Sequence, residues 1–319
     1  MAAETGLGVP GSVFHGVHVL DGALATELEA HGANIDGPLW SAHVLEEFPD
    51  KILAVHRSYL AAGADCIETA TYQVSRMGYI ECGYPPERAD AALLRGVELA
   101  RRAAAEFPGR RIVVAASLGP YGAALHNGAE YTGDYAIGFA GLVRFHRERI
   151  AVLAAARGDQ RPDVLAFETL PSLEEARAIA EALREAPELP AWFSFTCRDA
   201  AHAAHGERLC DCAAAVATLP QTAAIGVNCT HPSLIAALIA ELRAASHQPV
   251  IVYPNSGEGW DAARRCWTGT SDAAEFGALA AAWYRAGAQI VGGCCRTGPG
   301  HIRAVKQANS QWEELPPLS

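Results

Sequence analysis

The sequence contains no long hydrophobic run, no basic amino-terminal segment and no excess of positive charge. Nowhere do 18 apolar residues follow one another, and residues 1–6 carry neither a basic cluster nor an apolar stretch. A membrane-spanning helix and a secretory signal are therefore not expected, and a cytoplasmic location is. Only 19% of the residues are charged, and 36 acidic residues against 25 basic ones give a net charge of -11. Such an acidic chain is a poor partner for nucleic acid or an anionic membrane surface.

Paired Cys-x-x-Cys motifs, which are typical of structural zinc sites, are also missing. The chain has nine cysteines, an odd number, and its 319 residues are enough to fold without disulfide bonds. In a reducing compartment such cysteines are buried apolar residues, metal ligands or nucleophiles. They are Cys66, Cys82, Cys197, Cys210, Cys212, Cys229, Cys266, Cys294 and Cys295.

With 50% hydrophobic residues, a chain of this length forms either two ordinary domains or one α/β barrel. Eight short apolar runs are typical of parallel strands that are covered on both faces. Most of these runs are followed by a helical pattern. The eight runs are residues 17–20, 65–69, 111–117, 163–168, 191–196, 223–228, 249–253 and 289–293.

Several of the intervening helices have recognisable ends. An apolar stripe over residues 52–60 predicts a helix that terminates at Gly63. Ser172 and Glu175 form a capping box ahead of another helix, and a further helix is expected over residues 272–286. Strands that alternate with such helices favour a parallel sheet.

Residues 62–65 and 286–289, Ala-Gly-Ala-Asp and Ala-Gly-Ala-Gln, are near copies that each precede a strand. They indicate a helix-turn-strand unit that is used repeatedly. Eight units predict a single α/β domain over residues 1–319, a (β/α)8 TIM barrel with short tails at about 1–15 and 311–319. An open doubly wound sheet is the alternative, but no Gly-x-Gly-x-x-Gly motif follows the first strand to support it.

Polar residues cluster where the predicted strands end, and in a barrel these ends converge on one mouth. Three long connections, residues 70–86, 118–136 and 254–271, follow strand ends on the same face. The convergence of the polar residues is the functional signal. They are Asp21 and Gly22, Glu68 and Thr69, Glu168 and Thr169, Asn228 and Cys229, Asn255 and Ser256, and Cys294 and Cys295.

The adjacent cysteines Cys294 and Cys295 predict a metal site. Two consecutive side chains cannot both point into one apolar layer of a strand, whereas thiolates are suitable ligands for zinc. Cys229, at the end of another strand, is the best candidate for a third ligand, and an open fourth position would mark a catalytic zinc. The competing pair Cys210 and Cys212 falls in a helical stretch and is interpreted as packing. The other four cysteines are expected in the core or at the surface.

The histidines are not expected to act in catalysis. His202 and His205 have a spacing that could suit a metal, but they fall in a polar connection without a supporting acid, so a surface loop is predicted. His31, His126 and His231 are expected to be hydrogen-bonded or exposed.

Six motifs together make the chain similar to the homocysteine S-methyltransferase family over essentially its full length. They are Asp-Gly-Ala-Leu-Ala-Thr-Glu-Leu at 21–28, Glu-Thr-Ala-Thr-Tyr-Gln at 68–73, Glu-Thr at 168–169, Gly-Val-Asn-Cys at 226–229, Tyr-Pro-Asn-Ser-Gly at 253–257 and Gly-Gly-Cys-Cys-Arg-Thr at 292–297. The resemblance implies a barrel in which Cys229, Cys294 and Cys295 bind Zn²⁺. It further implies that zinc binds the homocysteine sulfur, which takes a methyl group to give methionine.

The resemblance also implies roles for the other residues at the strand ends. Asp21 and Glu168 would bind the homocysteine amino group, and the backbone of Gly22 would lie near its carboxylate. Arg296 could meet a carboxylate of the substrate or a neighbouring acidic side chain. Structural hydrogen bonds remain the alternative for the residues expected near the donor, Glu68, Thr69, Thr71, Tyr72 and Gln73, and for those expected to orient loops or substrate, Asn228 and Asn255.

The methyl donor implied by the resemblance is a sulfonium compound, S-methylmethionine or S-adenosylmethionine. The betaine-using branch of the family has an aromatic-rich stretch after its second-strand Glu-Thr and a tyrosine after its fourth-strand glutamate, where this chain has residues 70–73 and Thr169. The fourth zinc ligand of a substrate-free enzyme is therefore left unidentified. Folate-dependent and cobalamin-dependent relatives carry additional domains, for which this sequence has no counterpart.

Three alternatives remain open at this point. They are a betaine-type enzyme, a methyltransferase that acts on selenocysteine or another selenol, and a barrel that binds zinc and a thiol without turnover. The expected partners are small molecules, and the chain is expected to be a monomer or a homodimer.

Overall fold

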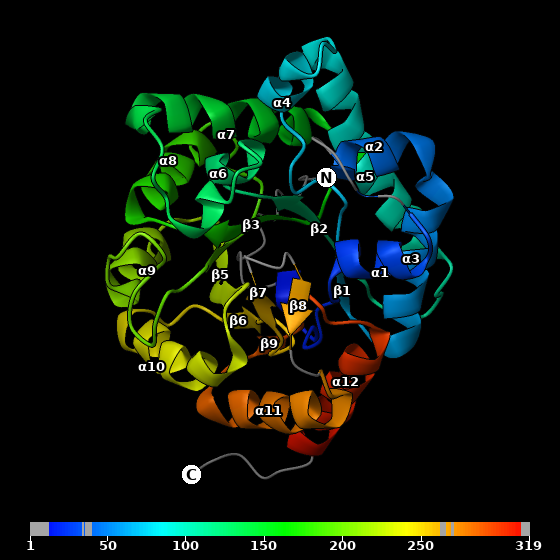
Figure 1. The fold of residues 1–319 in the computed structure, drawn as a ribbon, viewed down its shortest axis with the longest axis vertical. Coiled ribbons are helices and arrows are strands. Elements are labelled where there is room, and N and C mark those ends of the chain that lie inside the picture. The colour runs from blue at the N-terminus through cyan, green and yellow to red at the C-terminus, as the bar shows by residue number, and fades with distance from the viewer. Residues whose placement is uncertain (1–12, 34, 36–39, 262–265, 269–270, 314–319) are drawn as a thin grey trace, which may run out of the picture.

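The computed structural model describes residues 13–33, 35, 40–261, 266–268 and 271–313. Seven parallel strands form one sheet in the order β1-β2-β3-β4-β5-β6-β9, and helices surround it (Figure 1). The strands are β1 (Cys66–Glu68), β2 (Val113–Leu118), β3 (Val164–Leu170), β4 (Ala191–Phe195), β5 (Thr222–Asn228), β6 (Val250–Tyr253) and β9 (Ile290–Val291). This sequential order confirms seven predicted strands and contradicts the doubly wound alternative, whose strand order reverses.

The expected first strand, residues 17–20, is not a regular strand but bridges the two edges of the sheet. Val19 forms a parallel bridge with Val291 of β9, and Leu20 forms one with Cys66 of β1. The Leu20 amide donates to the Val291 carbonyl at 3.0 Å, and the Asp21 amide donates to the Cys66 carbonyl at 3.1 Å. These bonds occupy backbone groups that the edge strands would otherwise leave unpaired.

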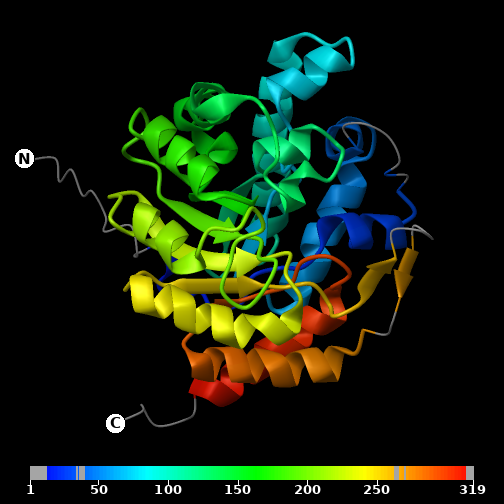
Figure 2. The same ribbon diagram turned by 60° about the vertical axis from the view of Figure 1, so that its left-hand side comes forward.

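The helices form a ring outside the curled sheet (Figures 1 and 2). They include α3 (Pro49–Ala62), α5 (Pro86–Ala105), α7 (Gly138–Ala155), α8 (Leu173–Leu183), α9 (Leu209–Ala217), α10 (Ile235–Ala245), α11 (Ala273–Ala286) and α12 (Pro299–Glu313). Shorter elements in the connections are α1 (Leu24–Ala30), α2 (Trp40–Glu47), α4 (Arg76–Glu81), α6 (Tyr121–Ala124), the 3-10 turns η2 (Ala129–Tyr131), η3 (Gly158–Gln160) and η4 (Pro232–Leu234), and the antiparallel pair β7 (Gly259–Asp261) and β8 (Cys266–Thr268).

The buried apolar residues fall into two clusters, one between the sheet and its helices and one inside the curl of the sheet. The outer cluster includes Ile52, Tyr59 and Leu60 of the predicted stripe on α3. The inner cluster collects alternate residues of the strands, such as Val164 and Ala166 of β3. Because the strands are buried on both faces, their sequences are apolar throughout.

The repeated helix-turn-strand unit has the same geometry at both places. Gly63 after α3 and Gly287 after α11 are left-handed, with φ of 110° and 112°. In both turns the next residue, Ala64 or Ala288, is buried and donates its amide back into the helix, to Tyr59 or Trp283. Only glycine adopts this backbone conformation at little cost, which explains why the sequence pattern located both helix ends.

The ends of the described chain are more ordered than the predicted tails. Of the tail expected over 1–15, residues 1–12 lie outside the described residues, but Phe14 is buried against Trp192 with ring centroids 5.8 Å apart. At the other end, residues 311–313 continue α12, whereas 314–319 lie outside the described part. An apolar anchor such as Phe14, in a segment without periodicity, gives no signal in the sequence.

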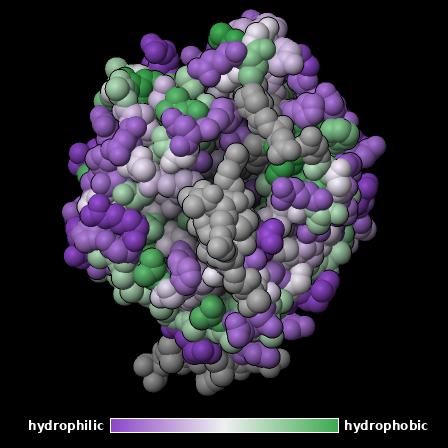
Figure 3. Space-filling model, in the orientation of Figure 1, coloured by the Kyte–Doolittle hydropathy of each residue, from purple (hydrophilic) through white to green (hydrophobic). Residues whose placement is uncertain are grey.

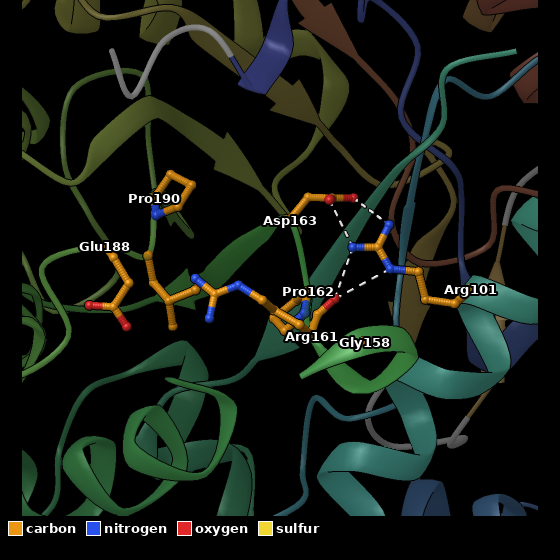
Figure 4. Close-up of a pocket in the computed structure, with 8 residues that line it drawn as sticks. Arg101, Gly158, Arg161, Pro162, Asp163, Glu188 and Pro190 are labelled. Carbon is orange, nitrogen blue, oxygen red and sulfur yellow. Dashed lines mark hydrogen bonds and ion pairs between the residues drawn. The ribbon is translucent and has the colours of Figure 1, made fainter. Parts of the chain in front are cut away.

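A cavity of about 260 Å³ lies at the amino ends of β3 and β4, and Figure 4 shows its lining residues. The Arg101 guanidinium donates to both carboxylate oxygens of Asp163, at 2.7 and 2.8 Å, and to the Arg161 carbonyl at 2.8 Å. Asp163 also accepts from the Val114 amide at 2.8 Å. The charges that line this cavity thus tie α5 to two strands and stabilise the fold at this end of the sheet.

Within the described residues, no helix is both long and apolar enough to cross a membrane. On the face that Figure 3 presents, hydrophobic residues are scattered among hydrophilic ones.

His56 on α3 allows a test of how burial affects stability. Its side chain is buried, neither ring nitrogen has a hydrogen-bond partner, and burial lowers its pKa to about 4. The pKa of an unfolded histidine is about 6.5, so the unfolded state takes up the proton first as the pH falls. The stability that neutral His56 contributes is complete above about pH 6.5 and is lost as the pH falls toward 4.

We expect His56→Leu to raise the free energy of unfolding by about 1 kcal/mol at pH 7, because an unsatisfied buried polar group is removed. Between pH 6.5 and 4 the free energy of unfolding of the variant should fall less steeply with pH than that of the wild type. The difference between the two slopes should correspond to the uptake of up to about one proton. Urea unfolding at pH 7, 6 and 5 measures both effects. Parallel pH profiles would show that His56 does not titrate during unfolding.

Candidate functional site

Three sulfur atoms lie together at the carboxyl ends of two strands. The Sγ atoms of Cys229, Cys294 and Cys295 are all within 4.8 Å of one another, and those of Cys229 and Cys295 are 3.5 Å apart. Cys229 directly follows β5, and the other two follow β9. Cys229 and Cys295, which are 66 positions apart in the sequence, therefore come into contact because both strands end at the same edge of the sheet.

The chain that follows β6 holds the two sulfur-bearing turns side by side, because β6 lies between β5 and β9. The Cys229 amide donates to the Tyr253 carbonyl at 3.3 Å, and the Cys294 amide donates to the Pro254 carbonyl at 2.7 Å. The Ser256 amide in turn donates to the Cys295 carbonyl at 3.0 Å. The motif at residues 253–257 thus acts through its backbone as a template for the sulfur cluster.

Three side chains at this mouth stand on a left-handed backbone. Thr169, Cys229 and Arg296 have φ of 58°, 49° and 67°. Residues other than glycine adopt this conformation at a cost of about 1–3 kcal/mol, and such strain gathers at functional sites. The left-handed turn at Cys229 directs its sulfur toward Cys294 and Cys295. Without the turn, the side chain would point in the direction set by the alternation of side chains along β5.

Two glycines allow the close packing beside the sulfurs. A Cβ atom on Gly293 would lie 2.3 Å from Thr297 Oγ1, and one on Gly22 would lie 2.9 Å from Tyr59 Cε1. Both separations are below van der Waals contact, so any side chain at these positions would displace its neighbours. Gly22 is therefore required by packing as well as by its expected place near a substrate.

Three carboxyl groups, those of Asp21, Glu68 and Glu168, are buried together next to the sulfurs. Asp21 Oδ2 accepts from the Glu68 amide at 2.9 Å, and Ser117 Oγ donates to Glu168 Oε1. Asp21 Oδ1 and Glu68 Oε1 are buried and have no hydrogen-bond partner among the described residues. The group thus has acceptor capacity that the chain itself leaves unused.

The pKa values of these carboxyl groups reflect their crowding. Burial is the largest cause that raises the pKa of each, well above the usual range for Asp21 and Glu68 and to about 7 for Glu168. The negative charge of Glu168 raises the first two further, and that of Cys294 raises all three. A cationic group placed among them would reverse this effect, because it favours the ionised carboxylates.

The sulfurs and carboxyl groups share one cavity of about 270 Å³. Of the twelve residues predicted to bind metal or substrate, ten line it. These are Asp21, Gly22, Glu68, Thr69, Tyr72, Gln73, Glu168, Cys229, Cys294 and Cys295. The structure thus brings together residues from five strand ends that the sequence separates by more than 270 positions.

The remaining two, Asn228 and Asn255, do not line the cavity. Asn228 Oδ1 accepts from the Thr169 amide and from Ser194 Oγ, both at 2.8 Å, and its Nδ2 donates to Thr169 Oγ1 at 2.8 Å. Two of these contacts hold the strained residue Thr169 in place, and the third ties Asn228 to β4. The Asn255 amide donates to the Thr230 carbonyl at 3.1 Å. Asn228 thus makes structural hydrogen bonds, whereas the side-chain oxygen of Asn255 is buried and has no hydrogen-bond partner among the described residues.

Two residues of the cavity, Glu130 and Tyr131 of η2, were not anticipated from the sequence. Tyr131 Oη lies 3.3 Å from Cys229 Sγ, and Glu130 lines the same cavity. They belong to the 118–136 connection. Its length is evident from the sequence, but no local sequence pattern determines its path. The nearest signal in the sequence is the concentration of tyrosine and glycine in this connection.

Glu175 explains how this connection is held. As predicted, Ser172 caps α8 by accepting from the Glu175 amide at 3.2 Å. The Glu175 carboxylate does not return to Ser172 as in a capping box. It is buried and accepts from the Tyr121 amide at 2.6 Å, the Tyr135 hydroxyl and His146 Nε2, the last at 2.9 Å. Both ends of the segment that carries η2 are thereby fixed to α8.

The other candidate residues have structural partners. The expectation that His202 and His205 lack a supporting acid is wrong, because His202 Nδ1 lies 2.9 Å from Asp199 and His205 Nδ1 lies 3.1 Å from Glu207. Arg296 Nε donates to Glu258 at 3.0 Å. Of the two partners considered for Arg296, a substrate carboxylate and a neighbouring acidic side chain, the structure contains the second.

Cys212 is buried in the outer core, and Cys210 lies half-buried beside it on α9. Of the remaining cysteines, Cys66 and Cys197 are buried and Cys82 is half-buried, whereas the side chain of Cys266 lies outside the described part.

The three sulfurs suit a soft or borderline metal ion. A tetrahedral ion with bonds to sulfur of about 2.3 Å places its ligands roughly 3.8 Å apart, which requires only small movements of this cluster. The thiols already interact, since hydrogen bonds from Cys229 and Cys294 lower the pKa of Cys295. A cation that replaced the thiol protons would relieve the crowding of three buried acidic groups.

The known proteins that are similar to this chain are methyltransferases. The family model described as homocysteine S-methyltransferase matches residues 18–309. Homocysteine S-methyltransferase YbgG of Bacillus subtilis is 44% identical over 295 residues, which cover 90% of this chain and 92% of the relative. Selenocysteine Se-methyltransferase of Brassica oleracea is 40% identical over 309 residues, 91% and 88% of the two chains. The metallated form of homocysteine methyltransferase MmuM from Escherichia coli superposes with a TM-score of 0.80 at 41% identity, covering 92% of this chain and 96% of that one.

The geometry predicts which cysteines bind metal. Cys229→Ser should lose stoichiometric metal, because an alcohol is a poor ligand where a thiolate is needed, whereas Cys210→Ser should keep it. Metal content per chain, measured by mass spectrometry after reconstitution with zinc, tests the pair. The opposite pattern would place the metal site elsewhere.

Proposed function

The chain belongs to the homocysteine S-methyltransferase family and is a methyltransferase, and on that premise we propose that it methylates homocysteine with a sulfonium donor to give methionine. The observation that carries the proposal is the single cavity in which three sulfurs lie next to three buried carboxyl groups. Neither a purely structural metal site nor a general acid-base site would need both groups together.

We propose that the resident metal is zinc, held by Cys229, Cys294 and Cys295. Three thiolates and one open position are typical of a catalytic zinc, and bound zinc would lower the pKa of the substrate thiol, near 8.5 when free, so that a thiolate is present at neutral pH. The mutual distances of the three sulfurs support this assignment. The thiols must stay reduced to bind metal, which fits a cytoplasmic location.

Asp21 and Glu168 are assigned to the ammonium group of homocysteine. Both side chains are buried and line the cavity, and Asp21 Oδ1 is an unused acceptor. An ammonium group brings three N–H donors and a positive charge, which together stabilise the ionised carboxylates. Glu68 adds a third acidic group, and the Gly22 backbone lies where the substrate carboxylate is expected.

The reaction is an in-line displacement that conserves all atoms and charges. The homocysteine thiol gives up its proton, its sulfur forms a bond to the donor methyl carbon, and the bond from that carbon to the sulfonium sulfur breaks with its electron pair. Homocysteine and S-methylmethionine thus yield two molecules of methionine and one proton. The chain contributes alignment of the two sulfurs and compensation of positive charge, and no general base is required.

At the level of the fold, we infer a closed (β/α)8 barrel in which residues 17–21 take the place of the first strand. The backbone bonds of this segment to β1 and β9 support closure. We also propose that the chain is one domain, since the inner cluster draws on all seven strands of the sheet.

A selenol is a second candidate acceptor, because one of the relatives is a selenocysteine Se-methyltransferase that is 40% identical. A selenol is more acidic than a thiol, and its selenolate is a softer nucleophile that could use the same cavity. Competition between selenocysteine and homocysteine for one donor separates the two candidates.

The proposed reaction has a direct test. Purified protein with zinc and homocysteine should form methionine from S-methylmethionine or S-adenosylmethionine, followed by mass spectrometry with a labelled methyl group. The two donors are assayed side by side to rank them. Absence of product with both would overturn the proposed function.

Asp21→Asn should raise KM for homocysteine about ten- to hundredfold, because it removes one charge-assisted contact to the ammonium. Its metal content should remain that of the wild type. Asp159→Asn, at the exposed η3 turn far from the cavity, provides the matched control. An unchanged KM in Asp21→Asn would assign the ammonium to other residues.

A further inference from the structure

A second pair of unused acceptors lines the same cavity. Glu130 Oε2 and Gln73 Oε1 are buried and have no hydrogen-bond partner among the described residues. Both residues line the cavity, one from η2 and the other from the connection between β1 and α4. Buried acceptors of this kind are normally satisfied, so their presence points to a ligand that donates hydrogen bonds.

The contact that Gln73 makes with His126 uses its side-chain nitrogen and leaves its side-chain oxygen unpaired. Its Nε2 lies 3.4 Å from Nδ1 of His126, and burial lowers the pKa of that histidine. A neutral imidazole accepts through one nitrogen, so the amide nitrogen donates to it. The amide oxygen is then left as an acceptor.

Glu130 enters the cavity from η2, whereas Asp21, Glu68 and Glu168 lie at strand ends. The pKa of Glu130 is raised by its burial, whereas the pKa values of Asp21 and Glu68 are raised also by Glu168. After burial, the negative charge of Glu130 is the largest influence that raises the pKa of Tyr72. Glu130 therefore belongs to the wall formed by Tyr72 and Gln73.

The position of Glu130 is fixed relative to the sulfur cluster. The next residue, Tyr131, places its hydroxyl 3.3 Å from Cys229 Sγ, and its amide donates to the Gly128 carbonyl at 3.0 Å. Gly122 of α6 packs against the turn so closely that a Cβ there would lie 2.4 Å from the Glu130 nitrogen. A group held by Glu130 would thus lie near the reacting sulfur in a preformed geometry.

We propose that Glu130, assisted by Gln73, binds the α-ammonium group of the methyl donor and restricts the enzyme to sulfonium compounds that carry an amino acid end. This inference rests on the proposed function. Homocysteine has one ammonium, which Asp21 and Glu168 bind, so a second set of unused acceptors requires a second ammonium. Betaine has a quaternary nitrogen without N–H groups and cannot supply it.

The test compares two sulfonium compounds that differ in the amino group. S-methylmethionine carries it, whereas 4-(dimethylsulfonio)butanoate has the same carbon chain with its sulfonium and carboxylate groups but without the amino group. For wild type and Glu130→Gln we would measure kcat/KM for S-methylmethionine and the inhibition constant of the second compound in competition with it. Glutamine keeps the shape of the side chain and removes the charge.

In Glu130→Gln we expect kcat/KM for S-methylmethionine to fall about ten- to hundredfold, mainly through KM, because a charge-assisted contact is lost. The inhibition constant of the amino-free compound should change less than about twofold. Glu174→Gln, an exposed position on α8, is the matched control and should change neither value. Metal content and the Kd for homocysteine, measured by calorimetry, should stay at the wild-type values.

Two results would overturn the assignment. An unchanged kcat/KM would mean that Glu130 does not contact the donor, and equal losses for both compounds would mean that it only supports the loop. Failure of the wild type to form methionine from any sulfonium donor is a different outcome, because it would overturn the proposed reaction itself.

Discussion

The site depends on one constraint, the backbone hydrogen bonds between the extension of β6 and the turns that follow β5 and β9. Through these bonds the Tyr253 and Pro254 carbonyls place Cys229 and Cys294, and the Ser256 amide places Cys295. Backbone groups have fixed geometry and little freedom to lose, so the sulfurs are brought together before any ligand arrives. The parallel sheet provides the spacing, and proline at position 254 offers a carbonyl at a place where no amide is needed.

Charge is the second organising feature of the cavity. Three carboxyl groups and three thiols, some buried and some half-buried, lie together, and their mutual repulsion and burial raise most of their pKa values. In isolation this arrangement is unfavourable, yet each expected ligand, a metal ion, an ammonium group and a sulfonium group, is positively charged. The acidic groups therefore act together, and electrostatic complementarity links recognition of the substrates to the reaction that they undergo.

Much of the fold followed from local patterns, because seven buried parallel strands and two glycine-terminated helices have clear sequence signals. The Cys294-Cys295 doublet and the polar strand ends likewise indicated most of the cavity. The features that the sequence did not predict are determined by tertiary contacts. Glu175 was expected to complete a capping box, but burial beside His146 and Tyr135 directs it to the 118–136 connection instead. Glu130 and Tyr131 enter the cavity through that connection, whose path no periodicity specifies. The first strand was also overestimated, since residues 17–20 make bridges only.

The left-handed backbone at Thr169, Cys229 and Arg296 sets a limit on engineering this protein for heat resistance. Glycine would relax the strain at each position, so an algorithm or a selection that rewards thermal tolerance alone would favour it. Each replacement would, however, delete a side chain that the mouth of the barrel uses: the sulfur of Cys229, the partner of Asn228 or the partner of Glu258. Thermal stability and the function of the side chains therefore conflict at these three positions. Variants intended for industrial temperatures should instead carry stabilising substitutions on the outer helices.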